Sequence, residues 1–175
     1  DKEVITGLPV IAPMSTRKII FEFNGEAITT KGQHECTVSL ISKGKTKDEK
    51  KIMMDAVENT DKYSKTFVSN IDGSLQYYAV SPQTRASRET CALFLAVHGV
   101  GVEAIGQARA YKQKDWGTLI AATNRRPRGF NWEDWGRLDA LEVLNIAKEK
   151  FKPDPKRIYL TGHSMGGHGT WFLGA

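Results

Sequence analysis

The sequence contains no long uninterrupted apolar run and only 2 cysteines among its 175 residues. A membrane-spanning helix needs about 18 or more consecutive apolar residues, so no membrane partner is expected. Cys36 and Cys91 lie far apart and form no C-x-x-C pair, so their spacing indicates no metal site. A single disulfide between them is compatible with the sequence, but two unpaired thiols are the favoured interpretation.

The sequence also lacks the patterns that would indicate a nucleotide or a nucleic acid as ligand. Gly99-Val100-Gly101 has neither the third glycine nor the Lys-Ser/Thr ending of a phosphate-binding loop. The net charge is +5, but the lysines cluster between residues 43 and 51, where no aromatic residue could stack on bases. We therefore expect Lys45–Lys51 to be a solvated loop, with no nucleic-acid partner and no cofactor.

The overall composition is that of a globular protein, with 40% hydrophobic and 26% charged residues. These proportions exclude disordered and collagen-like chains, and the length allows one sizeable core or a small domain plus part of another. The chain begins with Asp1-Lys2-Glu3 and shows no leader segment. A processed N-terminus followed by β structure favours a periplasmic or secreted protein, although the localisation stays open.

The first part of the chain has the pattern of antiparallel β structure. Four segments predict strands: Arg17–Phe23, Cys36–Ser42, Tyr63–Ser69 and Ser74–Val80. Asn24-Gly25 and Asp72-Gly73 are strong turn dipeptides, and the second lies between two predicted strands as in a hairpin. We expect residues 1–68 to form a small β-sheet or sandwich domain that leads into the edge strands of the next unit.

From Cys91 onward, predicted strands and helices alternate. Short apolar or β-branched runs predict three strands: Ala92–Val97, Thr118–Ala122 and Arg157–Leu160. Helices are predicted between and after them: Glu103–Lys112, Trp132–Phe151 and Met165–Ala175. Asn131 is the expected N-cap of the long helix, with Asp134 answering it, and the expected apolar face includes Trp135 and Leu138. The alternation predicts an α/β domain with a parallel sheet over residues 69–175.

The most informative stretch is Gly162-His163-Ser164-Met165-Gly166, which matches the pattern G-x-S-x-G. In this pattern a serine lies on a strained turn from a strand to a helix, and the two glycines leave room for crowded backbone. The predicted strand before Ser164 and the predicted helix after it supply that context. We therefore expect Ser164 to be a nucleophile, with Gly162 and Gly166 permitting the turn. The alternative is a glycine-rich turn that carries an ordinary surface serine.

Residues Cys91–Ala175 resemble the α/β-hydrolase superfamily, in particular its prolyl-oligopeptidase-like peptidases and carboxylesterases. Five segments carry the resemblance: His98–Gly101, Asn124–Pro127, Trp132–Trp135, Asp154–Tyr159 and Gly162–Trp171. The resemblance implies a partial α/β-hydrolase parallel sheet preceded by a small antiparallel β domain. It also implies an oxyanion hole made by the N–H of Met165 and that of Val100 or Gly101. The alternative for the second donor is that the glycines merely turn a tight loop.

One departure from the family concerns substrate class. Prolyl oligopeptidases proper place a tyrosine hydroxyl on the oxyanion loop, where this chain has Val100. A backbone donor would have to serve instead, which favours the esterase-like members. The expected substrate is a small-molecule ester or a peptide.

The second departure concerns the catalytic base. The fold orders its triad Ser…Asp/Glu…His, yet His34, His98 and His163 precede Ser164. His168 lies one helical turn after the serine, on the wrong side to accept its proton. We therefore expect the N-terminal portion of a longer serine hydrolase, which forms an acyl-enzyme at Ser164 and is nearly inactive without the missing C-terminal part. The alternative is a non-catalytic binding module on a hydrolase-like scaffold.

Other side chains near the motifs allow two interpretations. Arg125, Arg126 and Arg128 could bind an acidic substrate group or pair with Glu133 and Asp134. The tryptophans are expected to pack in the core or at its rim: Trp116, Trp132, Trp135 and Trp171.

Overall fold

The computed structural model describes residues 3–22, 28–85, 91–126 and 129–175. The chain divides into two compact units, one comprising Asp1–Val10 and Phe21–Glu58 and the other Ile11–Ile20 and Asn59–Ala175. The first unit contains a two-stranded sheet and the second a five-stranded sheet. Within the described ranges, no helix is both long and apolar enough to cross a membrane. Cys36 and Cys91 are both free thiols.

The first unit is built around an antiparallel ribbon of β1 (Gly32–Ser42) and β2 (Lys45–Ala56). The two strands are joined by Lys43 and Gly44, whose φ angles of 52° and 71° suit a tight hairpin turn. The loop expected at Lys45–Lys51 is therefore wrong, because these residues lie in β2.

The charged residues of β2 are accommodated because the ribbon is largely exposed and cross-strand pairs offset their charges. Lys51 Nζ lies 2.9 Å from Glu35 Oε1, and Ser39 Oγ donates to Glu49 Oε2 at 3.1 Å. Lysine density alone was thus a poor sign of a loop.

The strand expected at Arg17–Phe23 is also wrong over residues 17–22, which have no regular secondary structure. Phe23 and the Asn24-Gly25 turn lie outside the described residues.

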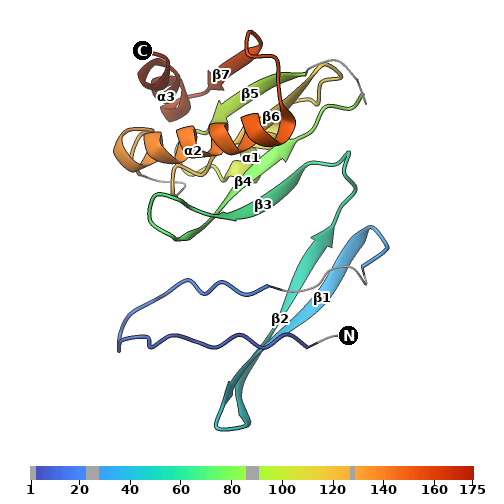
Figure 1. Ribbon diagram of the computed structural model, residues 1–175, viewed down its shortest axis with the longest axis vertical. Coiled ribbons are helices and arrows are strands. Elements are labelled where there is room, and N and C mark those ends of the chain that lie inside the picture. The colour runs from blue at the N-terminus through green and yellow to red at the C-terminus, as the bar shows by residue number, and fades with distance from the viewer. Residues whose placement is uncertain (1–2, 23–27, 86–90, 127–128) are drawn as a thin grey trace. The chain divides into compact units, whose positions relative to one another are not determined.

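The second unit contains a mixed sheet with the strand order β3-β4-β6-β5-β7 (Figure 1). Its strands are β3 (Tyr63–Val68), β4 (Leu75–Ser81), β5 (Ala92–Val97), β6 (Gly117–Ala121) and β7 (Ile158–Gly162). β4 runs antiparallel to both β3 and β6, whereas β5 runs parallel to β6 and β7. The predicted hairpin and the predicted α/β class are confirmed.

The expected boundary between residues 68 and 69 falls inside the β3–β4 hairpin. One boundary between the compact units lies between Glu58 and Asn59, so β3 lies in the same unit as the strand with which it pairs. The division into a β domain of residues 1–68 and a hydrolase-like domain of residues 69–175 stays a prediction.

Helices cover both faces of the five-stranded sheet. On one face, α1 (Ala104–Ala110) packs through Ala104 and Ala108 against small residues of the strands, such as Ala96 and Ala121. On the other face, α2 (Asp134–Phe151) and α3 (Met165–Gly174) pack over the larger core. Alternate residues of β5 point to opposite faces, as the period of a strand requires.

The long helix differs from its prediction in its start and in its buried face. It begins at Asp134 after Glu133, so the N-cap expected at Asn131 is wrong. Trp135 and Leu138, expected in the core, are 42% and 40% exposed. The buried face consists largely of small residues: Gly136, Asp139, Ala140, Val143 and Ala147. Small side chains allow the helix axis to approach the sheet closely, and that close approach excludes the larger residues from the interface.

Candidate active site

Ser164 occupies the turn between β7 and α3, where the strand ends at Gly162 and the helix begins at Met165. The predicted strand–turn–helix context is confirmed. Ser164 has φ 57° and ψ −121°, a conformation that side-chain-bearing residues rarely adopt and that costs about 1–3 kcal/mol. Ser164 is exposed, so the strained turn leaves the residue open to solvent.

The glycines on either side of the serine lie where no side chain would fit. A Cβ on Gly162 would lie 2.1 Å from the carbonyl oxygen of Gly166, and a Cβ on Gly166 would lie 2.0 Å from that of Val97. Both contacts are with backbone, which cannot move aside as a flexible side chain can. The start of α3 is thus pressed against the ends of β5 and β7 (Figure 1).

The loop after β5 lies beside the serine. Val97 pairs with Gly162 in the parallel ladder, so the carboxyl ends of β5 and β7 meet at the same edge of the sheet. A Cβ on Gly99 would lie 3.5 Å from Ser164 Cβ and 3.4 Å from the carbonyl oxygen of His163. The structure therefore brings together the loop of Val100 and Gly101 and the nucleophile turn, although the roles of these residues remain predictions.

The His98 side chain contacts the peptide between Gly99 and Val100 in this loop. Its side chain is fully buried, and its ring nitrogens lie 2.8 Å from the Gly99 carbonyl oxygen and 3.0 Å from that of Thr123. Val102 N–H also donates to the Gly99 carbonyl, at 3.2 Å. In a trans peptide the C=O and the following N–H point in opposite directions, so these contacts also orient the N–H of Val100.

Among the described residues, no histidine ring is hydrogen-bonded to the Ser164 hydroxyl. His98 is occupied by the two carbonyls, and His168 Nε2 lies 2.8 Å from Glu133 Oε1. His34 contacts the Thr30 carbonyl in the first unit. A serine hydroxyl needs such a base to give up its proton during attack, and none of these rings is placed for that step.

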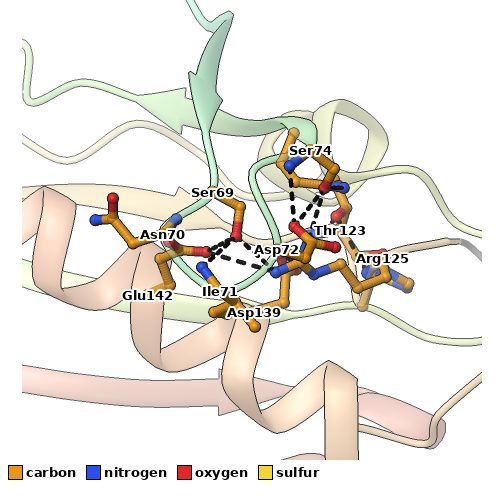
Figure 2. A network of polar contacts seen from close by, with 11 residues as sticks. Ser69, Asn70, Ile71, Asp72, Ser74, Thr123, Arg125, Asp139 and Glu142 are labelled. Carbon is orange, nitrogen blue, oxygen red and sulfur yellow. Dashed lines mark hydrogen bonds and ion pairs between the residues drawn. The ribbon is translucent and has the colours of Figure 1, made fainter. Parts of the chain in front are cut away.

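Among the arginines near the site, Arg125 differs from both expectations. Arg125 pairs with neither Glu133 nor Asp134, and with a side chain only 8% exposed it is not open to a substrate. It lies between three carboxylates (Figure 2), those of Asp72 at 3.4 Å, Asp139 at 3.4 Å and Glu142 at 3.5 Å. Arg126 lies over a ring as a cation–π contact, 4.7 Å from the Phe130 centroid. Arg128 lies outside the described residues.

The Arg125 network ties the β3–β4 turn to α2. Arg125 Nη2 donates to Ser69 Oγ at 2.9 Å, and Ser69 Oγ donates to Glu142 at 2.7 Å (Figure 2). Burial raises the pKa of Asp139, despite the neighbouring guanidinium of Arg125 and the bonds from Thr123. Hydrogen bonds from Ser74 lower the pKa of Asp72. No local pattern could have signalled this network, because its members come from three distant segments.

Trp132 is the residue near the site that motif reasoning undervalued. It is the one fully buried tryptophan in the described part of the chain, whereas Trp116, Trp135 and Trp171 are 45%, 42% and 84% exposed. Its indole Nε1–H donates to the His98 carbonyl at 3.0 Å. In the same described part, no group of three or more acidic, histidine or cysteine side chains is arranged to hold a metal ion.

No family model and no curated protein sequence matches the chain. Its structure is similar to that of an S-formylglutathione hydrolase from Agrobacterium tumefaciens, with a TM-score of 0.51 and 17% identity over 64% of this chain and 52% of that chain. It is also similar to a thermostable esterase, with a TM-score of 0.51 and 20% identity over 73% of this chain and 42% of that one. A third similar structure is FphF, a fluorophosphonate-binding serine hydrolase of Staphylococcus aureus, with a TM-score of 0.52 and 18% identity over 62% and 49% of the two chains.

The sheet order, the turn at Ser164 and these likenesses together define the class: the chain contains part of the α/β-hydrolase fold. It spans about half the length of these three solved structures, between 42% and 52%.

Proposed function

We propose that the chain is the N-terminal portion of a serine hydrolase that cleaves carboxylic esters or peptide bonds through an acyl-enzyme at Ser164. The observation that carries this proposal is the conformation of Ser164. The residue is exposed, has φ 57° on a strand-to-helix turn, and lies against the loop that begins at Gly99. Backbone strain at a position where structure over-determines the conformation is typical of catalytic residues.

The proposed reaction begins with attack of Ser164 Oγ on the carbonyl carbon of the substrate. As the new C–O bond forms, the carbonyl electrons move onto oxygen, and the hydroxyl proton passes to a base. The N–H of Met165 and that of Val100 or Gly101 would stabilise the oxyanion, and losing one such donor typically raises the barrier by about 3 kcal/mol. The leaving group then departs with the proton, and water hydrolyses the acyl-enzyme.

The base and its acid partner would come from chain beyond Ala175, because the fold orders its triad Ser…Asp/Glu…His. The outer side of β7 supports this part of the proposal. Among the described strands, β7 pairs only with β5. Beside it lies a largely apolar groove lined by Leu160, Trp171 and Gly174, with Trp171 84% exposed. Further strands of the same protein would cover this groove and complete the sheet.

The absence of a tyrosine at Val100 favours esters over peptides within the proposed class. Val100 is 59% exposed beside the serine, and its side chain has no hydrogen-bond donor. Oxyanion stabilisation would then rest on backbone N–H groups.

The test is labelling with a fluorophosphonate probe, with the adduct located by mass spectrometry. We expect the longer protein that carries this chain to be labelled at Ser164, and this chain alone to be nearly unreactive. A Ser164→Ala variant of the longer protein is the matched control and should lose the adduct. If the longer protein is not labelled, the hydrolase proposal fails and the non-catalytic binding module becomes the better account. Rapid labelling of the short chain would refute the proposal that its catalytic base lies beyond Ala175.

A further inference from the structure

Trp132 contacts three segments near the nucleophile: the loop after β5, the loop after β6 and helix α3. Its indole Nε1–H donates to the His98 carbonyl at 3.0 Å, and its backbone N–H donates to Asn124 Oδ1 at 3.3 Å. A Cβ on Gly169 of α3 would lie 2.5 Å from the indole ring, so the helix rests directly on it. The side chain is 0% exposed, and water therefore cannot replace these contacts.

The backbone at Trp132 is held in an unfavourable conformation. Its φ is 66°, and Phe130 and Asn131 before it have φ values of 59° and 45°. Bulky residues rarely adopt such angles unless surrounding contacts impose them. The indole is fully buried, and α2 begins two residues later, at Asp134. Strain of this kind often accompanies a functional constraint.

We propose that Trp132 is a positioning residue for the oxyanion hole. This inference rests on the proposed function, since it concerns the two backbone donors of that site. The His98 carbonyl belongs to the peptide that enters the loop, so the indole N–H fixes the plane of that peptide. The indole also lies edge-on to the His98 ring, with centroids 4.9 Å apart and an interplanar angle of 67°.

The indole acts on each donor through a residue that it contacts, His98 on the loop and Gly169 on α3. On the loop side, the His98 ring lies 2.8 Å from the Gly99 carbonyl and thereby orients the N–H of Val100. On the helix side, the contact at Gly169 sets the position of α3, whose first residue, Met165, carries the other N–H. A single rigid side chain thus sets the separation of the two donors. Misplacement of such groups by about 1 Å can cost on the order of 100-fold in rate.

The test is a Trp132→Phe variant of the longer protein, which keeps an aromatic ring but removes the N–H donor. We expect kcat for a p-nitrophenyl ester to fall about tenfold, with KM changed by less than about threefold, because the oxyanion is absent from the bound substrate and develops only during attack. The rate of fluorophosphonate labelling at Ser164 should fall in parallel. Trp135→Phe is the matched control, since Trp135 is 42% exposed and lies over Arg125. Its kinetics should match wild type.

A folded Trp132→Phe variant with wild-type kcat would overturn the proposal, and so would an equal loss in the Trp135→Phe control. Should the Trp132 variant not fold, the wild-type protein still decides the matter. Its indole ¹H–¹⁵N resonances, assigned through bonds, would be compared before and after phosphonylation of Ser164. We expect the Trp132 resonance to shift clearly more than that of Trp135, and no such difference would refute the proposal. Failure of the proposed function would appear separately, as an unlabelled wild-type protein.

Discussion

Arg125 Nε and Asp139 Oδ1 lie 3.4 Å apart, and neither of these buried atoms has a hydrogen-bond partner. The pair is thus held by charge attraction without the geometry of a hydrogen bond. Arg125 also faces Asp72 and Glu142, so three carboxylates share one guanidinium. Asp139 and Glu142 are in or near the core, where an unpaired charge is costly.

Replacing the arginine should therefore be strongly destabilising. Arg125→Met removes the cation that pairs with all three carboxylates, and we expect the free energy of unfolding to fall by about 3–5 kcal/mol. Urea denaturation would measure the change. Arg126→Met is the matched control, because Arg126 is exposed and its guanidinium lies over the Phe130 ring as a cation–π pair. A loss below about 1 kcal/mol in Arg125→Met, the range of exposed pairs, would contradict the prediction.

The two aspartates of this network should respond to pH in opposite directions. Burial raises the native pKa of Asp139, so its contribution to stability is present below the unfolded pKa of about 3.9 and is lost as pH rises through the native value. Bonds from Ser74 lower the native pKa of Asp72, so its contribution is present above about 3.9 and is lost as pH falls through the native value.

Asn substitutions would separate these effects. From about pH 3 to pH 7, the stability advantage of wild type over Asp139→Asn should shrink, and its advantage over Asp72→Asn should grow. Chemical denaturation at several pH values would provide both slopes. Slopes of the same sign would show that one of the two environments is not as described.

Two glycines of α3 should differ sharply in their tolerance of alanine. A Cβ on Gly166 would meet the Val97 carbonyl oxygen at 2.0 Å, whereas one on Gly167 would meet nothing within 4 Å. We expect Gly166→Ala to displace α3 and to prevent normal folding. In the longer protein, the same variant should lose labelling at Ser164. Gly167→Ala should be neutral or stabilising by up to about 1 kcal/mol, because alanine is the better helix former. Thermal unfolding and soluble yield would compare them, and equal tolerance would count against the close packing.

The strain at Ser164 predicts a stability trade-off at the candidate nucleophile. With φ 57° and ψ −121°, this position suits glycine better than any residue with a Cβ. We expect Ser164→Gly to be more stable than Ser164→Ala by about 1–2 kcal/mol, although both lack the hydroxyl. Denaturation of the two variants side by side would test this. If Ser164→Ala were the more stable, the turn would not be strained as described.

Much of the second unit could be predicted from local patterns. The apolar run at Ala92–Val97 and the dipeptide Asp72-Gly73 indicated a buried strand and a hairpin, and both are present. The buried face of α2 could not be predicted this way. Hydrophobic periodicity selected Trp135 and Leu138, but the contact with the sheet uses small residues such as Gly136 and Ala140. How closely a helix can approach a sheet depends on partners that the helix sequence does not contain.

The candidate site shows the same division. Local sequence was sufficient to select Ser164 and its flanking glycines, because a strained strand-to-helix turn imposes residue types at fixed spacing. The burial of Trp132 and the pairing of Arg125 with Asp139 were decided only by the tertiary structure. Local backbone geometry is determined by residues that are close in the sequence. Burial and charge pairing depend instead on which distant segments the sheet brings together.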